Sequence, residues 1–326
     1  MGSPSSDLSG PARPTPGYAA LDRDYVPPPP EPDVRRQPIV RHLVLFAATL
    51  LMTTVMGAEH YSGFLGAGAA IPTGWALYQH GLGYSAAVLG ILGAHEMGHY
   101  LACRYYRIDA SLPYFLPAPL LAGTLGAFIR IRQPIPNKRE LFDIGIAGPI
   151  AGFLVAIPVL FIGVSLSNMF KVPTTGSVWI FGEPLLLKGV IWLVWGVREA
   201  GFDLNIHPVG IAGWFGLVAT LLNLFPFGQL DGGHISYAVL GRRSTYVSYA
   251  TILCFLALSI VSMTWIAWTA LMLAMLFFFG PHHPRTHDEH MPLDTGRLWL
   301  AAFAVVMFVL CFTPAPVTYV ELGGPP

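Results

Sequence analysis

The stretch His95-Glu96-Met97-Gly98-His99 lies inside an apolar run from Tyr84 to Tyr106, and it decides how this chain is interpreted. At helical spacing the two histidines project from one face, as two ligands of a single zinc ion must. Glu96 follows His95 directly, where its carboxylate can take a proton from a metal-bound water. An apolar run of this length is typical of a helix that crosses a lipid bilayer.

Composition places the chain among multi-span membrane proteins. Apolar residues make up 54% of the 326 positions and charged residues 11%, whereas about a quarter of a soluble domain is charged. The formal net charge is zero, and no basic tract is long enough to follow a phosphate backbone, which argues against nucleic acid as a partner. The three cysteines are scattered, so they indicate helix packing and say nothing about redox compartment.

Seven apolar stretches predict an all-α polytopic membrane protein with about six to eight transmembrane helices. They cover 41–58, 84–103, 144–168, 206–226, 246–264, 265–280 and 298–314, of which the stretches ending at 280 and 314 are short. Two further stretches, 61–80 and 185–197, are ambiguous, because each also fits a re-entrant or interfacial segment.

Three regions follow from this pattern. Residues 1–40 are rich in Ser, Gly and Pro and contain four consecutive prolines, so we expect a disordered cytoplasmic tail. Residues 41–316 are expected to form the membrane domain, with a core at about 84–240, and 317–326 a short C-terminal tail.

Basic residues indicate the orientation. Groups of arginine and lysine precede the first span and follow the second and fourth, and another group fills the connection from 104 to 143. If all of them lie in the cytoplasm, every span crosses once and the N-terminus is cytoplasmic. The chain lacks an Arg- and Ser-rich, acid-poor leader, which favours a bacterial inner membrane over an organelle.

The paired histidines lie at membrane depth. At 1.5 Å per residue, His95 is about 13 Å and His99 about 7 Å along the helix from Arg104. Each ionisable side chain at the middle of a bare membrane helix costs on the order of 2.5–3.5 kcal/mol, so this site needs a compensating metal, water or partner. The alternative, histidines that only hydrogen-bond within a core, is disfavoured in this environment.

A third ligand is required, and the segment from Asn223 to Gly233 supplies a candidate in Asp231. Pro226 predicts that the helix beginning near His207 kinks or ends there. Broken backbone at membrane depth is tolerated only beside a cavity, and the glycines around Asp231 would let it turn back toward the ion. A plain helix-terminating turn is the alternative.

Together, His95-Glu96-x-x-His99 and the later Asn223-x-x-Pro226-x-x-x-Leu230-Asp231-Gly232 resemble the paired motifs of the site-2 protease family of intramembrane zinc metalloproteases, peptidase family M50. Gly148-Pro149-Ile150-Ala151-Gly152 is similar to the glycine-proline element of that family. The chain resembles a minimal form without PDZ or CBS domains, and it is more similar to members without a PDZ domain, such as the plastid ones, than to those with it.

The resemblance implies one zinc ion held by His95, His99 and Asp231, with Glu96 as general base and Asn223 near the scissile carbonyl or its oxyanion. It implies cleavage of transmembrane segments of single-span membrane proteins within the lipid bilayer. It also implies membrane-associated strands near the site. The segment Gly123 to Arg132 reads as such a β-hairpin or re-entrant loop, or else as a basic connecting loop.

Other functions fit less well. A desaturase needs several histidine boxes, and a protease of the prenyl-protein type needs a later intramembrane glutamate. A non-catalytic scaffold or transporter with the same fold is the main alternative, although such a relative would be expected to lose Glu96 or Asp231.

A further cluster of histidines is expected to form a solvated loop and not a second metal site: His282, His283, His287 and His290. His234 is expected to face away from the ion or to bond locally. Substrate identity and oligomeric state cannot be predicted from the sequence.

Overall fold

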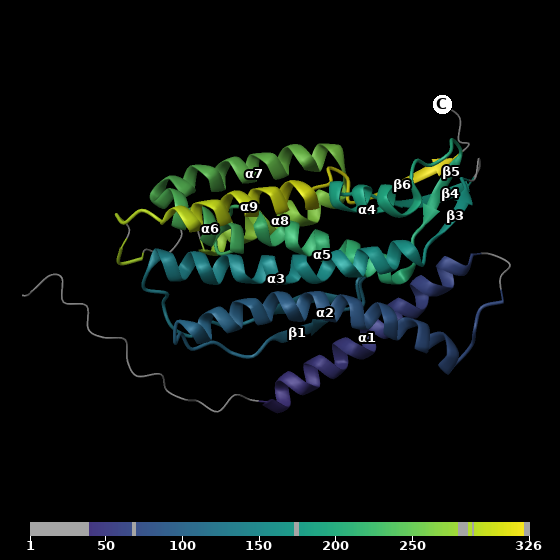
Figure 1. Cartoon of the computed structure of the whole chain (residues 1–326), viewed down its shortest axis with the longest axis horizontal. Coiled ribbons are helices and arrows are strands. Elements are labelled where there is room, and N and C mark those ends of the chain that lie inside the picture. Colours follow the sequence, from purple (N-terminus) through teal and green to yellow (C-terminus); the bar gives the residue numbers. More distant parts are fainter. Residues whose placement is uncertain (1–38, 67–69, 173–175, 280–285, 289, 323–326) are drawn as a thin grey trace, which may run out of the picture. The chain divides into compact units, whose positions relative to one another are not determined.

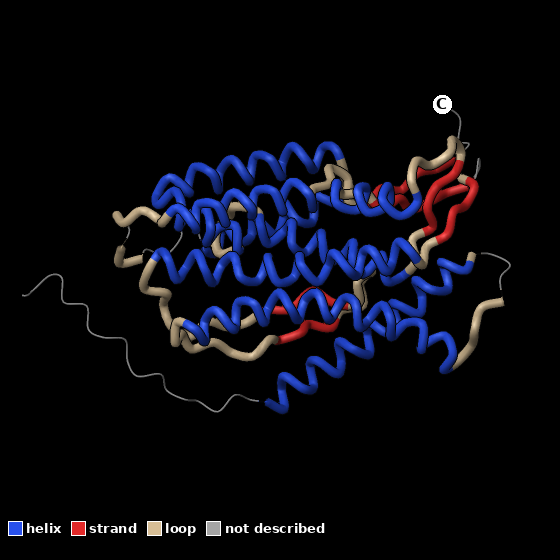
Figure 2. Tube along the Cα trace, viewed as in Figure 1, coloured by secondary structure: helices blue, strands red, loops and turns tan. Residues whose placement is uncertain are grey.

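The computed structural model describes residues 39–66, 70–172, 176–279, 286–288 and 290–322 (Figures 1 and 2). Most of the described residues are helical. The helices are α1 (Ile39–Leu65), α2 (Trp75–Tyr105), α3 (Lys138–Ser165), α4 (Leu185–Trp195), α5 (Pro208–Leu224), α6 (Asp231–Leu240), the 3-10 helix η1 (Gly241–Arg243), α7 (Ser244–Val261), α8 (Thr264–Phe279) and α9 (Thr295–Cys311). The predicted N-terminal tail lies outside the described residues up to position 38.

Among the described residues, three segments are long and apolar enough to cross a membrane: Ile39–Leu65, Lys138–Ser165 and Asp231–Val261. The helix α2 has 31 residues but is not among them, which we attribute to the polar His95, Glu96 and His99 within it. The expectation of six to eight spans therefore stays a prediction. Of the two ambiguous stretches, 61–80 contains the end of α1 and the start of α2, and 185–197 contains the 11-residue α4.

The segment Asp231–Val261 is not one straight helix. Phe225, which precedes α6, contacts Phe255 of α7 with ring centroids 4.5 Å apart, so the chain must turn back at η1. Gly241 makes this turn possible, because its φ of +58° is a conformation that side-chain-bearing residues rarely adopt. Helix α5 and helix α6 also contact each other across the break near Pro226, and both pack on α3.

The interior of the bundle is built around α2 and α3. Helix α2 packs against α1, α3 and α5, and α3 packs against α5. Glycines allow close crossings: a Cβ at Gly81 of α2 would lie 2.1 Å from the carbonyl oxygen of Thr54 in α1, and one at Gly163 of α3 would lie 2.1 Å from the nitrogen of Gly210 in α5. Such small-residue contacts are typical of helices packed in membranes.

The described strands form three antiparallel pairs, which are red in Figure 2. Strand β1 (Tyr114–Pro117) pairs with β2 (Thr124–Phe128), β3 (Asn168–Lys171) with β5 (Phe202–Asn205), and β4 (Gly176–Phe181) with β6 (Val317–Leu322). Residues 317–322, which we expected in a C-terminal tail, therefore form a strand. The β1–β2 pair contacts α1 and α2, and whether it associates with a membrane stays a prediction.

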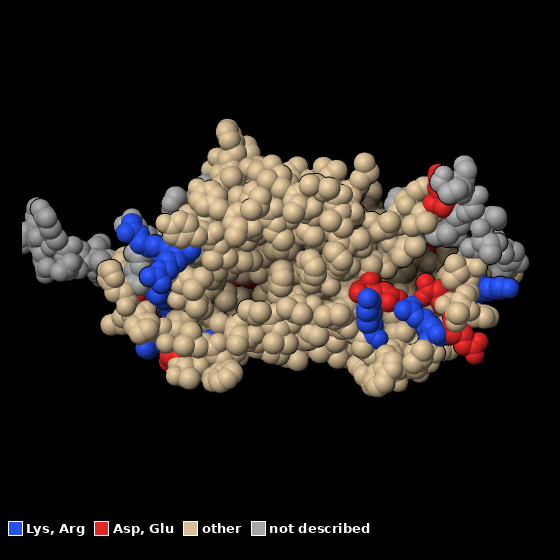
Figure 3. Space-filling view, turned by 90° about the horizontal axis from the view of Figure 1, so that it is seen from above, with Lys and Arg blue, Asp and Glu red and all other residues tan. Residues whose placement is uncertain are grey.

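Charged side chains gather at two ends, and the uncharged middle of the face in Figure 3 separates them. At one end, Arg297 of α9 bonds Asp143 of α3, and Tyr106 at the end of α2 donates to the same carboxylate. At the other end, Arg198 bridges Glu183 and Asp203. With many large apolar side chains exposed in between, this distribution is that of a membrane protein.

Candidate metal centre

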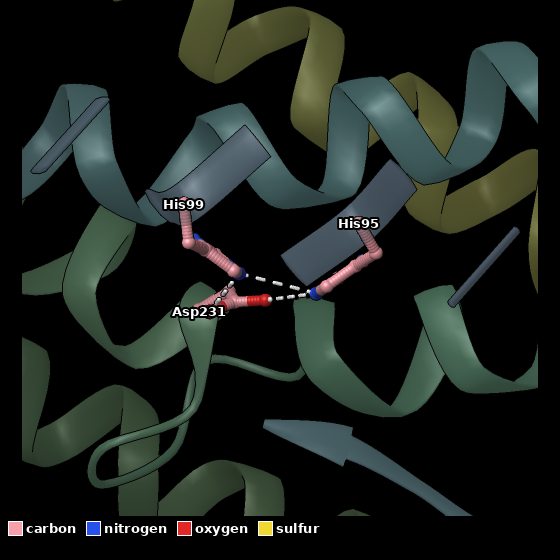
Figure 4. Close-up of side chains that lie close together, drawn as sticks. All are labelled: His95, His99 and Asp231. Atoms are coloured by element: carbon pink, nitrogen blue, oxygen red, sulfur yellow. Dashed lines mark hydrogen bonds and ion pairs between the residues drawn. The ribbon is translucent and has the colours of Figure 1, made fainter. Parts of the chain in front are cut away.

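Three ionisable side chains from two distant segments converge on one point (Figure 4). The Nε2 atom of His95 lies 3.1 Å from Oδ2 of Asp231, and Nε2 of His99 lies 3.3 Å from Oδ1 of the same carboxylate. The two Nε2 atoms are 3.1 Å apart. His95 and His99 are four residues apart on α2, so both face the start of α6, where Asp231 is the first residue.

The donor set fits a metal ion. The Nδ1 atom of His99 donates to the backbone carbonyl of Ile144 over 2.7 Å, which leaves a lone pair on Nε2. Nε2 then faces a carboxylate and a second imidazole nitrogen, an arrangement that a bound cation stabilises. A tetrahedral zinc ion with bonds of about 2.0–2.1 Å holds its ligand atoms about 3.3–3.4 Å apart, close to the observed separations. Within the described residues this is the only His, Cys, Asp and Glu group of that kind.

Two glycines of α3 make room for the histidines. A Cβ at Gly148 would lie 2.1 Å from Nε2 of His99, and one at Gly152 would lie 3.1 Å from Cβ of His95. On the opposite side of this contact, a Cβ at Gly98 would lie 2.4 Å from the carbonyl oxygen of Ala147. The glycine-proline element singled out in the sequence is thus the surface on which the paired histidines rest.

The break between α5 and α6 positions Asp231. As the sequence predicted, the helix ends before Pro226: its last residue is Leu224, and Phe225 has an extended ψ of 130°. Gly228 then takes a positive φ of +52°. A Cβ at Gly232 would lie 2.0 Å from the carbonyl oxygen of Leu224, so α6 starts in direct contact with the end of α5.

Glu96 and Asn223 flank the three converging residues. Glu96 is buried with 6% of its surface exposed, and its carboxylate interacts with the backbone N–H of Ile129, just after β2. It therefore faces the strand pair, while its neighbour His95 faces α3 and α6. The amide nitrogen of Asn223 lies 3.2 Å from Nε2 of His95.

The remaining histidines lie elsewhere. His282 and His283 are outside the described residues. His287 is tied through its backbone N–H to the carbonyl of Pro136, and His290 is exposed. His234 packs against α3: a Cβ added to Gly145 would lie 2.9 Å from the Cβ of His234.

Two contributors at the centre were missed by sequence reasoning. The carbonyl of Ile144 orients His99, and the N–H of Ile129 contacts Glu96. Both are backbone groups, so no residue type marks them. The only sequence signal was position: Ile144 precedes the glycine-proline element, and Ile129 lies in the segment with a partly alternating pattern.

Comparison with known proteins supports this picture. Residues 83–264, more than half of the chain, match the model of Peptidase family M50. A chloroplastic protein of Arabidopsis thaliana, named "Probable zinc metalloprotease EGY2", is 26% identical over 74% of this chain and 43% of its own length. The rice (Oryza sativa subsp. japonica) protein named "Probable zinc metalloprotease EGY1, chloroplastic" is 31% identical over 70% of this chain and 39% of its own length.

No solved structure matches the chain. The chain spans less than half the length of the two relatives just described. The family match includes both His95-Glu96-x-x-His99 and Asp231, the residues that the fold brings together. The chain therefore belongs to peptidase family M50.

Proposed function

We propose that this protein is a zinc-dependent intramembrane endopeptidase that cleaves transmembrane segments of other proteins. The observation that carries the proposal is the convergence of His95, His99 and Asp231 in a bundle with an apolar surface. When bound there, a zinc ion supplies a Lewis acid and lowers the pKa of a water molecule toward 7. The names of the relatives, which call them zinc metalloproteases, support the choice of metal.

Each polar residue of the centre then has a distinct task. His95, His99 and Asp231 hold the metal, and the carbonyl of Ile144 keeps His99 in the tautomer whose Nε2 can bind it. Glu96 accepts a proton from the attacking water and can return it to the nitrogen of the departing amine. We assign the amide of Asn223 as the hydrogen-bond donor to the oxygen of the scissile carbonyl, on which negative charge develops.

Burial suits these tasks. Glu96 exposes 6% of its surface, and His95 and His99 expose 5% and 7%. Such a site keeps bulk water away from the carboxylate and strengthens the electrostatic interactions within it. For hydrolysis, one water molecule and one extended peptide segment must enter this buried site.

We further propose that the chain crosses the bilayer seven times. The crossing segments are α1, α2, α3, the interrupted pair α5 and α6, α7, α8 and α9. The 11-residue α4 is too short to cross. The basic end, which includes Lys138 and Arg297, would face the cytoplasm by the positive-inside tendency, with the N-terminus on the same side. A bacterial inner membrane stays a prediction, and the two relatives are named chloroplastic.

The strand pair offers a way to present substrate. A transmembrane helix must unwind before any of its carbonyls can react, and an extended segment can add to the edge of a strand. A cavity of about 360 Å³ lies along β2 and is lined by Thr124, Leu125 and Gly126, with Leu222 of α5 on its other side. Because Glu96 of the metal centre interacts with the backbone N–H of Ile129 just after β2, a segment lying along β2 would pass close to the metal centre.

Cleavage of a single-span reporter by the purified full chain in detergent tests the proposal. We expect cleavage within or beside the apolar segment, loss of cleavage after zinc is removed by a chelator, and recovery when stoichiometric zinc is returned. Unchanged cleavage by protein shown to be free of metal would refute the zinc mechanism. A folded protein that neither contains nor takes up zinc would indicate the scaffold alternative instead.

A further inference from the structure

A second cavity, of about 470 Å³, lies between α6, α7 and α9. Its α7 wall is formed by Val247, Ala250, Thr251 and Cys254, which recur at helical spacing and make one stripe. The α9 wall repeats this spacing from Ala301 to Phe308. Apart from Ser236, Thr251 and Cys254, the lining side chains are apolar. We call this cavity the α6–α7–α9 groove.

The length of the groove suits part of one extended hydrocarbon chain. Along α6 it reaches from Gly232 to Leu240, eight residues or about 12 Å.

The groove ends at a basic turn. Arg243 lies one helical turn before Val247 on the stripe that lines the groove, and Arg242 and Arg243 are both exposed. Tyr246 and Tyr249 on the same part of α7 are also exposed, by 76% and 51%, as is typical of a membrane–water interface. From Arg243 to Cys254 the helix rises about 16 Å, close to half of a ~30 Å hydrocarbon core.

We propose that the α6–α7–α9 groove binds one anionic phospholipid, with an acyl chain among the apolar side chains and the phosphate at Arg242 and Arg243. A zwitterionic lipid offers the same chain but no net negative charge, so charge selects the ligand. The groove is separate from the metal centre, but both share α6: Asp231 begins the helix, and Ile235 and Val239 line the groove. A bound chain therefore supports the helix that carries Asp231.

The test measures binding and needs no catalytic activity. Cys254 lines the groove and is exposed, whereas Cys103 and Cys311 are buried, so a bimane fluorophore should attach selectively at Cys254. The labelled full chain is placed in vesicles that contain phosphatidylcholine with a small, equal fraction of brominated phosphatidylglycerol or brominated phosphatidylcholine. Bromine quenches only a fluorophore that it contacts.

We expect brominated phosphatidylglycerol to quench at least threefold more than its phosphatidylcholine counterpart. The double variant Arg242→Gln/Arg243→Gln should remove that preference, and Arg139→Gln, an exposed arginine at the start of α3, should retain it. Ala250→Phe, which fills the groove, should reduce quenching by both lipids. Leu253→Phe, on an exposed neighbouring position outside the groove, should not.

Equal quenching by the two lipids in the parent protein would overturn the proposal. So would a preference that survives Arg242→Gln/Arg243→Gln. If an added single-span peptide displaced the brominated lipid and relieved quenching, the groove would belong to a protein segment instead. Retained helical circular dichroism in each variant shows that a lost preference is not a loss of fold, and cleavage activity affects none of these readouts.

Discussion

The Nδ1 atom of His99 donates to the backbone carbonyl of Ile144 over 2.7 Å, and this bond joins the metal-facing helix α2 to the first turns of α3. It fixes the tautomer of an imidazole whose other nitrogen faces Asp231. Because the acceptor is a backbone atom, the orientation of His99 depends on where α3 lies. Changes that move α3 should therefore weaken metal binding without touching a ligand.

Gly148→Ala tests this dependence. The new methyl group would lie 2.1 Å from Nε2 of His99, so the ring or α3 must shift. We expect zinc affinity to fall about 10- to 100-fold, as for other changes to the support of a metal ligand. Gly90→Ala on α2, where nothing lies within 4 Å, is the matched control and should keep its zinc. Equal zinc affinities in the two variants, by competition with a chelating dye, would contradict the packing argument.

Asp231→Asn tests the third ligand. The amide preserves the shape of the side chain but removes the negative charge that faces both imidazoles. We expect a loss of zinc affinity larger than 100-fold, because the removal of a hydrogen-bond partner of a metal ligand already lowers metal affinity 10- to 100-fold. The control is Asp109→Asn, which removes a carboxylate that pairs with Arg132 in a connecting loop. Stoichiometric zinc in purified Asp231→Asn would rule this carboxylate out as a ligand.

Asp143→Asn tests the fastening of α3 at its basic end. Asp143 accepts hydrogen bonds from Arg297 and Tyr106, and about three quarters of both members of its ion pair is buried. Hydrogen bonds to charged groups contribute about 1.5–3 kcal/mol, so the thermal unfolding midpoint should fall measurably. Asp294→Asn, whose carboxylate is more exposed than that of Asp143 and also meets Arg297, should change it much less. A larger fall in the unfolding midpoint of Asp294→Asn than of Asp143→Asn would show that the more buried ion pair does not hold α3 in place.

His207 predicts a pH dependence at the opposite end of the bundle. Burial, together with nearby His80, lowers the pKa of His207 below its usual 6.5. The neutral ring accepts a hydrogen bond from the N–H of Val209 and caps α5. Its stabilising contribution is thus fully present above pH 6.5 and is lost as pH falls through the lower folded pKa.

The unfolding midpoint should accordingly fall between pH 7.5 and pH 5.5 by more in the parent than in His207→Asn. Asparagine also caps helices but does not titrate. An identical pH response in both proteins would contradict this account, because it would show that folding leaves the pKa of His207 unchanged.

Much of the fold could be predicted because long apolar stretches leave little choice of structure. The seven stretches from 41–58 to 298–314 each overlap a helix, and Pro226 ends α5 as its missing N–H requires. The need of zinc for a third protein ligand made Asp231 a candidate, and the resemblance to the site-2 protease family implied the full set of His95, His99 and Asp231.

What could not be predicted depends on contacts between distant parts of the chain. Residues 317–322 form a strand only because 176–181 lies alongside them, and nothing in the local sequence indicates that partner. The η1 turn, which folds α6 back on α7, depends on the single positive φ of Gly241. The support of His99 by Ile144 uses a backbone carbonyl, which every residue has.

The most direct test of the central claim is the rate at which Glu96→Gln cleaves a single-span reporter, measured together with its zinc content. The variant keeps His95, His99 and Asp231 but has no carboxylate to accept a proton. We predict that it retains about one zinc ion per chain and cleaves at least 100-fold more slowly than the parent, as expected for loss of a general base. Cleavage at the parental rate by zinc-loaded Glu96→Gln would contradict the account.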